Sequence, residues 1–171
     1  MRNTVKIIIF VIFFFIIGVF YISLTRETNY STLSLINKEV PQFKIEYFEK
    51  NGFYSKQDLI QNNYTLINFW ASWCGPCKIE HPILMKLSAE SNLKILGVNF
   101  KDKKDLARKF LKDFGNPYSF LLKDIEGKQS ISFGIYGIPE SLLINNENII
   151  IKKFVGPLSH DNYKEIKEMI N

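Results

Sequence analysis

Hydrophobic positions beyond the N-terminal part of the chain follow two different spacings. Continuous apolar runs at 65–70 and 93–100 are bounded by turn-forming residues, which predicts buried strands. Apolar residues recur at helical spacing over 75–91 and 104–114, and Gly115 ends the second of these helices. The order of strand, helix, strand and helix favours a layered α/β domain.

The remaining hydrophobic runs complete a central mixed sheet. Three further strands are expected, at 118–122, 141–144 and 149–155. A final helix is expected over 159–170, with Ser159 as its N-cap. The stretch 41–64 is expected to add a short hairpin and a helix before the first central strand. The whole pattern predicts one α/β domain around a central mixed sheet.

The N-terminal hydrophobic segment departs from this globular pattern. Residues 7–24 carry no charge, and as a helix they would extend roughly 27 Å at about 1.5 Å per residue, close to the hydrocarbon thickness of a bilayer. Tyr21 stands near the end of the run, where an interfacial aromatic is typical. The alternative, a cleaved signal peptide, would have a shorter apolar core followed by a small-residue cleavage site. We therefore predict one retained transmembrane helix.

The anchor divides the chain into four parts. Arg2 and Lys6 precede the apolar run, which favours a cytoplasmic N-terminus. The C-terminal domain then lies across the membrane, in an oxidising compartment where cysteines need a redox explanation. The predicted parts are a short cytoplasmic N-terminus at 1–6, the transmembrane anchor at 7–24, a polar linker at 25–40 and the α/β domain at 41–171.

Composition narrows the class of protein further. The 171 residues carry a net charge of +5, and 46% are hydrophobic and 23% charged, which is typical of a globular protein. Apart from three basic residues that flank the anchor, Lys is interspersed with Asp and Glu. Such a surface is mixed and solvated, so nucleic acid is not an expected partner. Two cysteines are too few for a disulfide-rich scaffold or a four-cysteine zinc module.

The two cysteines stand together as Cys74-Gly75-Pro76-Cys77, between a predicted strand and a predicted helix. At a helix start, unpaired N–H groups and the positive end of the helix dipole favour a thiolate on Cys74. Cys77 lies one turn further on, near enough for a disulfide. We expect Cys74 to be the exposed nucleophile and Cys77 to be the sheltered thiol that resolves a mixed disulfide. Pro76 suits the first helical turn.

The cysteine pair has other interpretations. A purely structural disulfide across so short a loop would constrain the unfolded chain very little. A zinc site would need His81 and the distant His160 as the remaining ligands, and would leave Pro76 without a role. A haem-attachment motif is excluded because Lys78 stands where a histidine is required. We therefore expect redox chemistry and no metal.

A proline supports the redox interpretation. Gly137-Ile138-Pro139-Glu140 precedes a predicted strand, and an X-Pro bond in a tight turn is a candidate cis peptide. A cis bond would expose the backbone of Ile138 for pairing with a substrate strand. An ordinary turn proline is the alternative.

Longer strings carry a family resemblance over roughly residues 41–165. One string resembles the active-site motif of the thioredoxin superfamily, namely Trp70-Ala71-Ser72-Trp73-Cys74-Gly75-Pro76-Cys77. Four further strings resemble the DsbE/CcmG type of membrane-anchored thioredoxin-like proteins. They are Glu80-His81-Pro82, Gly97-Val98-Asn99-Phe100-Lys101-Asp102, Phe114-Gly115-Asn116-Pro117-Tyr118 and Tyr136-Gly137-Ile138-Pro139-Glu140-Ser141.

The resemblance implies a thioredoxin-like fold and a thiol–disulfide oxidoreductase of cytochrome c maturation. Such a protein is anchored in the bacterial inner membrane, and its domain reduces the haem-binding cysteines of apocytochrome c in the periplasm. The implied partners are apocytochrome c, other maturation proteins and a membrane electron donor of the thiol-reductase type. No cofactor is implied beyond the redox-active disulfide. The implied site residues are Cys74 and Cys77 as the redox pair, Ile138 and Pro139 as substrate contacts, and Trp73, Pro76, Glu80 and Glu140 as residues that tune the active site.

The two glutamates have a chemical rationale. Thioredoxins usually have a buried Asp six residues before the first cysteine, but this chain has Asn68 there, which cannot titrate. A proton acceptor for Cys77 must come from elsewhere, and Glu80 lies one helical turn beyond it. A desolvated carboxyl would have a raised pKa and could accept that proton. The alternative for Glu80 and for Glu140 is an ordinary solvated residue.

Two other functions remain compatible with the sequence. The first is a general extracytoplasmic thioredoxin-like reductase with other clients. The second is a non-catalytic module that binds apocytochrome chains during assembly. Both cysteines and the proline are present, which favours an enzyme.

Overall fold

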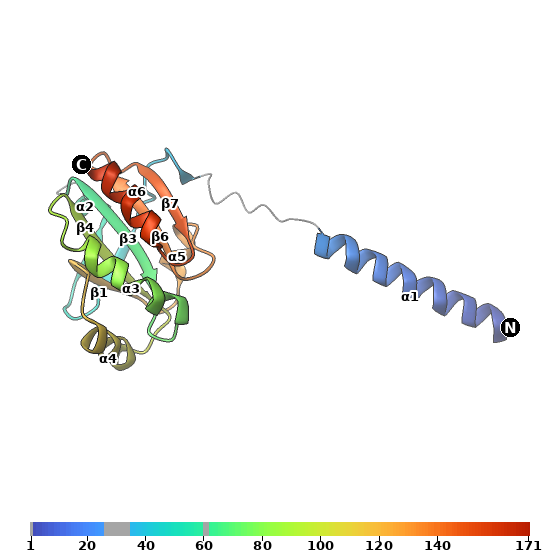
Figure 1. Cartoon of the computed structure of the whole chain (residues 1–171). Helices are drawn as coiled ribbons and strands as arrows, with labels where there is room; N and C mark the ends of the chain where they lie inside the picture. Colours follow the sequence, from blue (N-terminus) through green and yellow to red (C-terminus); the bar gives the residue numbers. More distant parts are fainter. Residues whose placement is uncertain (1, 26–34, 60–61) are drawn as a thin grey trace. The chain divides into compact units, whose positions relative to one another are not determined.

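The computed structural model describes three ranges of the chain, residues 2–25, 35–59 and 62–171 (Figure 1). In the first range it describes the side chains of residues 5–21. The predicted polar linker at 25–40 lies largely outside the described residues. The chain divides into two compact units, residues 1–31 and 32–171, and each unit has its own architecture.

The first unit contains helix α1 (Arg2–Thr25), so the helix expected over 7–24 is confirmed. The described side chains of α1 after Lys6 are uncharged, and most of them are large, apolar and exposed, up to Tyr21. In the described part of the chain, no helix is long and apolar enough to cross a membrane, so the predicted span remains a prediction.

The second unit is built on a seven-stranded mixed sheet with the order β2-β1-β5-β4-β3-β6-β7 (Figure 1). The β3–β4 and β4–β5 pairs are parallel, and the other pairs are antiparallel. The strands are β1 (Lys44–Tyr47), β2 (Phe53–Ser55), β3 (Tyr64–Trp70), β4 (Leu93–Phe100), β5 (Phe120–Asp124), β6 (Glu140–Asn145) and β7 (Ile150–Val155). The predicted α/β fold with a central mixed sheet is therefore confirmed.

Apolar residues cover both faces of this sheet. The alternation of β3 separates the faces: Leu66 and Trp70 point to the side of α3, α4 and α6, whereas Ile67 and Phe69 point to the opposite side, where Phe133 at the end of α5 packs. The helices of this unit are α2 (Lys56–Leu59), α3 (Gly75–Leu87), α4 (Lys104–Phe114), α5 (Lys128–Ser132) and α6 (His160–Ile170). The resulting three layers place the start of α3 just beyond the end of β3.

Two predicted boundaries are wrong by a few residues, each for a local reason. Strand β5 begins later than predicted, because the amide of Tyr118 donates to Oδ1 of Asn116 at 3.0 Å and closes a turn. Helix α3 ends earlier than predicted, at Leu87, and the amide of Ser88 caps it by donating to the carbonyl of Leu84. In both places a turn replaces the regular element.

Two helix starts show how side chains select local structure. The predicted cap of the final helix is confirmed, because Oγ of Ser159 accepts a hydrogen bond from the amide of Asn162. Helix α5 was not predicted, and it is only five residues long. The buried carboxylate of Asp124 accepts hydrogen bonds from both the amide and the hydroxyl of Ser130, which holds this short turn in place.

Candidate active site

The turn between β3 and α3 carries the two cysteines. Cys74 is the N-cap of α3 and has an extended backbone. Its Sγ accepts a hydrogen bond from the amide of Cys77 at 3.1 Å, so the sulfur takes the place of the oxygen in an ordinary cap. The two cysteines form a disulfide, with Cα atoms 5.3 Å apart. The N-terminal end of the helix, which favours an anion, is thus directed at the Cys74 sulfur.

The predicted exposure of Cys74 is wrong for this disulfide form. Cys74 is 5% exposed and Cys77 is 2% exposed. The sulfur of Cys74 is bonded to Cys77 and lies 3.7 Å from the carbonyl oxygen of Ile138, so the neighbouring loop covers it. Trp73 and Pro76 are exposed, and the cysteine turn therefore still lies at the protein surface.

The loop that covers Cys74 spans residues 134–140 and is called here the cis-proline loop. The Ile138–Pro139 peptide bond is cis, which confirms that prediction. The carbonyl of Pro139 accepts a hydrogen bond from the amide of Gly156 at 3.0 Å, which ties the loop to the end of β7. The pairing of the Ile138 backbone with a substrate strand stays a prediction.

Glu80 lies one helical turn beyond Cys77 and is fully buried. Its Oε1 accepts a hydrogen bond from Nδ2 of Asn68 at 2.8 Å, and its Oε2 accepts one from the amide of Leu158 at 2.9 Å. Burial raises the pKa of Glu80 to about 7, because the two hydrogen bonds offset only part of the desolvation. The alternative of a solvated residue is therefore wrong. A carboxyl with this pKa can take up and release a proton near neutral pH.

Asn68 is a buried hydrogen-bonding centre. Its Nδ2 donates to Oγ of Ser141 at 3.0 Å as well as to Glu80, and its Oδ1 accepts from the hydroxyl of Tyr118 at 3.0 Å. Ser141 and Tyr118 were not predicted as site residues. They stand 73 and 50 residues away from Asn68, so no local pattern joins them. The sequence signal for this cluster is a polar residue within each of two apolar strands, Asn68 in β3 and Ser141 in β6.

Glu140 is also buried, on the opposite face of the sheet, and is not a solvated residue. Its Oε2 lies 2.7 Å from Nζ of Lys153, and the two side chains are 4% and 0% exposed. Its Oε1 accepts hydrogen bonds from the amides of Tyr136 at 3.2 Å and Gly137 at 3.1 Å. Lys153, which was not predicted, also donates to the carbonyl of Gly134 at 2.8 Å. This ion pair fastens the cis-proline loop to β7.

Asp102 fixes the turn that precedes the cysteines. Its carboxylate accepts hydrogen bonds from the amide of Ser72 at 2.6 Å, from the hydroxyl of Ser72 at 2.8 Å and from Nδ2 of Asn99 at 3.0 Å. Nε1 of the predicted residue Trp73 donates to the carbonyl of Lys101 at 3.1 Å. The loops after β3 and β4 are therefore held together, and the exposed Trp73 ring has a defined position.

The histidines do not join the cysteines. Nε2 of His81 lies 3.0 Å from the carbonyl oxygen of Gly115, its ring packs against Phe110, and burial lowers its pKa. His160 stacks on Tyr163 at the start of α6. Among the residues that the structure describes, no group of three His, Cys, Asp or Glu side chains could hold a metal ion.

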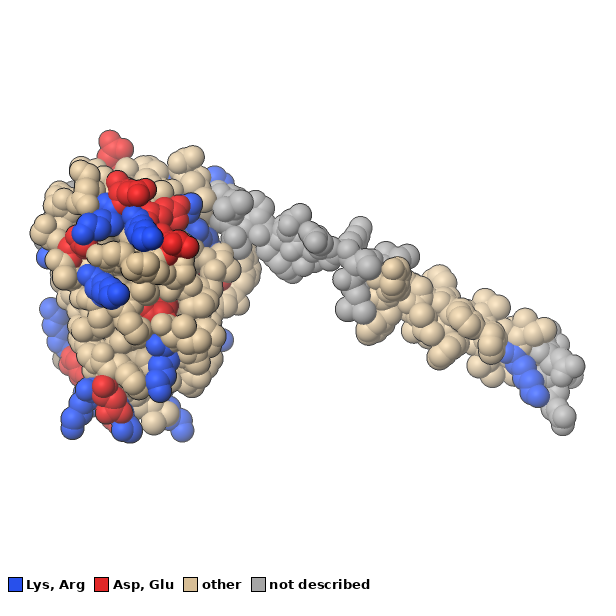
Figure 2. Space-filling model, in the orientation of Figure 1, with Lys and Arg blue, Asp and Glu red and all other residues tan. Residues whose placement is uncertain are grey.

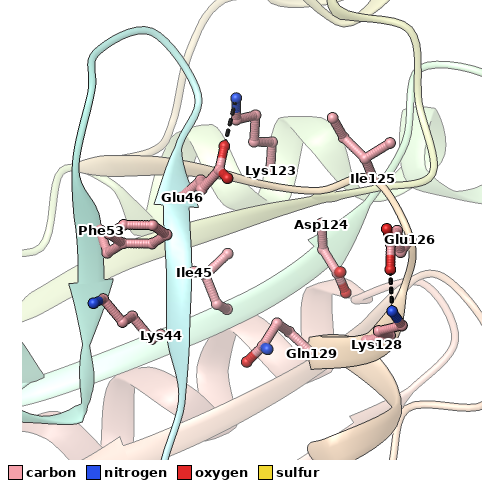
Figure 3. A pocket seen from close by; sticks show the side chains of 10 residues that line it. All are labelled: Lys44, Ile45, Glu46, Phe53, Lys123, Asp124, Ile125, Glu126, Lys128 and Gln129. Carbon is pink, nitrogen blue, oxygen red and sulfur yellow. Dashed lines mark ion pairs between the residues drawn. The ribbon is translucent and has the colours of Figure 1, made fainter.

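Many charged residues away from the cysteines are paired with each other. Figure 2 shows Lys and Arg interspersed with Asp and Glu over the visible face of the domain. The hollow of about 330 Å³ in Figure 3 lies beside β1, β5 and α5, and two ion pairs line it, Lys123 with Glu46 and Lys128 with Glu126. No predicted site residue lines this hollow, so it is separate from the cysteine site.

The sheet topology, the cysteine turn and the cis-proline loop define a thioredoxin-like protein. Residues 36–170 match the Redoxin family, and the chain belongs to this family. It is 36% identical over 166 residues to the thiol:disulfide interchange protein DsbE of Escherichia coli K12, an overlap of 93% of this chain and 89% of the relative. It is 34% identical over 146 residues to the thiol:disulfide interchange protein HelX of Rhodobacter capsulatus, an overlap of 85% and 82%.

A solved structure agrees with the sequence relatives. A protein of Chlorobium tepidum described as DsbE is similar with a TM-score of 0.66 and 25% identity, over 78% of this chain and 94% of that protein. The resemblance drawn from the motifs is therefore confirmed: the protein is of the DsbE/CcmG type. It is a thiol–disulfide oxidoreductase with Cys74 and Cys77 in its Cys-x-x-Cys motif.

Glu80→Gln should remove a pH dependence of stability from the disulfide form. The pKa of Glu80 rises from 4.5 to about 7 on folding, so the folded protein holds this proton more tightly than the unfolded chain. The free energy of unfolding should therefore fall by about 3 kcal/mol as the pH rises from about 4.5 to 7, and the variant should lack this fall. Urea unfolding of the full-length protein in detergent at both ends of this range measures the difference. The exposed substitution Glu168→Gln should behave as wild type, and an equal fall in Glu80→Gln would contradict the assignment.

Asp102→Ala should lower the free energy of unfolding by about 2 kcal/mol, because it leaves the amide of Ser72 and the Asn99 side chain without their acceptor. Asp105→Ala is the matched control, since this neighbouring side chain is 95% exposed and should change stability little. Urea unfolding of both variants compares them directly. Equal losses would show that Asp102 does not hold the cysteine turn.

Proposed function

We propose that this oxidoreductase reduces the haem-binding cysteines of apocytochrome c and so acts in cytochrome c maturation. The observation that carries the proposal is the cysteine pair at the N-terminus of α3, directly facing the cis-proline loop. The named relatives are thiol:disulfide interchange proteins, and the DsbE/CcmG resemblance implies this pathway.

The reaction transfers two electrons from the protein to its client. In the reduced protein, the thiolate of Cys74 attacks one sulfur of the client disulfide, and the other client sulfur leaves as a thiolate. Cys77 then attacks Sγ of Cys74 and releases the first client sulfur. The Cys74–Cys77 disulfide that results is the form of the protein described above.

Glu80 is the proton acceptor for Cys77 in this cycle. The two residues are one turn apart on α3 and both are buried, so solvent does not compete for the proton. The pKa of Glu80, raised to about 7 by burial, is matched to proton uptake near neutral pH. Deprotonation of Cys77 produces the thiolate that attacks Cys74.

The cis-proline loop is the client contact. The backbone of Ile138 lies beside the Cys74 sulfur, where an extended client segment would bring its own sulfur. Glu140 and Lys153 hold this loop in place from within the fold. Exposed Trp73 and Pro76 border the cysteines and tune access to them.

The cycle uses no cofactor, because Cys74 and Cys77 themselves carry the electrons. Each turnover leaves the protein oxidised, and a membrane electron donor of the thiol-reductase type restores the thiols by disulfide exchange. Other cytochrome c maturation proteins are the further partners. Nucleic acid has no part in the proposal.

The proposed location is the bacterial inner membrane, with residues 7–24 as a single-pass anchor and the C-terminal domain in the periplasm. The uncharged sequence of this run and the exposed apolar side chains of α1 support anchoring. Arg2 and Lys6 support a cytoplasmic position for residues 1–6.

Cys77→Ala should trap clients on Cys74 in the native membrane, because the mixed disulfide can no longer be resolved. We expect apocytochromes c and their maturation partners to dominate the conjugates, which a reductant releases and mass spectrometry identifies. The double variant Cys74→Ser, Cys77→Ala is the control and should form none.

Other outcomes of this trapping experiment discriminate between functions. A broad mixture of secreted proteins would replace the proposal with a general extracytoplasmic reductase. An absence of conjugates, with apocytochrome still retained by non-covalent binding, would replace it with a non-catalytic assembly module.

The full-length protein should remain in the membrane pellet after extraction with alkaline carbonate. Replacement of Phe13 and Ile17 by Lys places two charges in the middle of the apolar run and should release the protein into the soluble fraction. Immunoblots of the two fractions measure the distribution. Release of the wild-type protein would contradict anchoring by residues 7–24.

A further inference from the structure

Two polar residues and a glycine lie side by side on three neighbouring strands of the sheet. Asn68 of β3 is in register with Gly97 of β4 on one side and with Ser141 of β6 on the other. Side chains in register on neighbouring strands point to the same face, which here is the face covered by α3 and its Glu80. The site thus has a polar row within an apolar sheet.

The absent side chain at Gly97 makes room for Tyr118. A Cβ atom at residue 97 would lie 2.5 Å from Cδ1 and 2.6 Å from Cγ of the Tyr118 ring, which real Cβ atoms do not tolerate. The ring therefore lies directly over Gly97 and reaches the next strand, where its hydroxyl donates to Oδ1 of Asn68 at 3.0 Å. Residue 97 is a glycine because a larger side chain would overlap the Tyr118 ring.

The hydroxyl of Tyr118 decides which way the Asn68 amide points. An ionised carboxylate can only accept hydrogen bonds, so Glu80 requires Nδ2 of Asn68 and not Oδ1. That orientation leaves Oδ1 buried and in need of a donor, which Tyr118 provides. Burial raises the pKa of Tyr118 well above its usual value, so this hydroxyl keeps its proton throughout the working pH range.

We propose that Tyr118 is a positioning residue for the redox reaction: through the Asn68 amide, it keeps the carboxylate of Glu80 in the ionised state that accepts the proton of Cys77. The proposal rests on the proposed function of Glu80. It also gives roles to Gly97 and Tyr118, which belong to two of the motif strings of the family.

Other groups around Glu80 do not replace this contact. The amide of Leu158, before α6, donates to the second carboxylate oxygen, and Ser141 of β6 faces Asn68. On α3 itself, the neighbouring His81 points to the carbonyl of Gly115. Glu140 and Lys153 belong to the opposite face of the sheet. Tyr118 interacts electrostatically with this carboxyl, and Cys77 precedes Glu80 by one turn on α3.

Tyr118→Phe is the decisive variant, because it removes one oxygen atom and keeps the ring over Gly97. The full-length reduced protein, labelled with ¹³C at the Glu carboxyls and held in detergent, allows the Glu80 titration to be followed by NMR. Glu80→Gln identifies its signal. We expect the midpoint to move upward by about one pH unit, a tenfold gain in proton affinity, because the amide is no longer fixed toward the carboxylate.

Tyr54→Phe is the matched control. Tyr54 is also buried, and its hydroxyl also donates to an acceptor in the fold, the carbonyl of Asp58. It lies in the core on the other side of the sheet. It should leave the Glu80 midpoint at the wild-type value. An unmoved midpoint in Tyr118→Phe, or an equal shift in Tyr54→Phe, would overturn the proposal.

A second variant tests whether the position of the Tyr118 ring over Gly97 matters for Glu80. Gly97→Ala keeps the hydroxyl but displaces the ring that carries it, so it should shift the midpoint in the same direction as Tyr118→Phe. A wild-type midpoint in folded Gly97→Ala would contradict the positioning of Tyr118 over Gly97. Near- and far-ultraviolet circular dichroism establishes that each variant is folded.

The pH profile of disulfide exchange separates this proposal from the proposed function. Reduction of a peptide disulfide that contains a haem-binding Cys-x-x-Cys-His sequence should become slower at a given pH in Tyr118→Phe, with the profile displaced by the same amount as the carboxyl midpoint. A displaced midpoint with an unchanged exchange profile would support the positioning of Glu80 by Tyr118 and overturn the assignment of Glu80 as the proton acceptor.

Discussion

The burial of the Glu80 carboxyl is the constraint on which the arrangement of this domain depends. A carboxylate removed from water is unfavourable unless hydrogen-bond donors replace the water. The donors here come from Asn68 in β3 and from Leu158 just before α6. Sheet, cysteine helix and C-terminal helix must therefore meet at one point. Apolar packing alone would allow α3 to slide, whereas these directional contacts allow one position.

Separate buried or partly buried polar groups hold the two loops that surround the cysteines. Asp102 fixes the turn before Cys74, and the pair of Glu140 and Lys153 fixes the cis-proline loop from the opposite face of the sheet. Each loop beside the cysteines therefore has its own polar support, and Trp73 is held by a further hydrogen bond to the carbonyl of Lys101. The two faces of the sheet thus hold different polar groups, the buried Glu80 carboxyl on one and the ion pair that places the cis-proline loop on the other.

Much of this fold can be predicted from the sequence, because the strands are continuous apolar runs and the helices have a clear apolar period. The cysteine site can also be predicted, since a Cys-x-x-Cys motif at a helix start is a local feature. The burial of Glu80 and Glu140 could not be decided from the pattern, because their partners are remote in sequence. The same holds for Cys74, which is covered by a carbonyl 64 residues away. Helix α5 is too short to show a helical period.

The contact between Leu158 and Glu80 has a consequence for biosynthesis. It joins residues 78 positions apart, and Leu158 precedes the last helix of the chain. The ribosome therefore releases both cysteines long before the amide that completes the Glu80 environment. A nascent chain stalled after β7 would have its cysteine turn and all seven strands of its sheet, but not the Leu158 amide that donates to Glu80. The complete hydrogen-bonding environment of Glu80 thus forms only after Leu158 has been synthesised, well after the cysteine turn has been made.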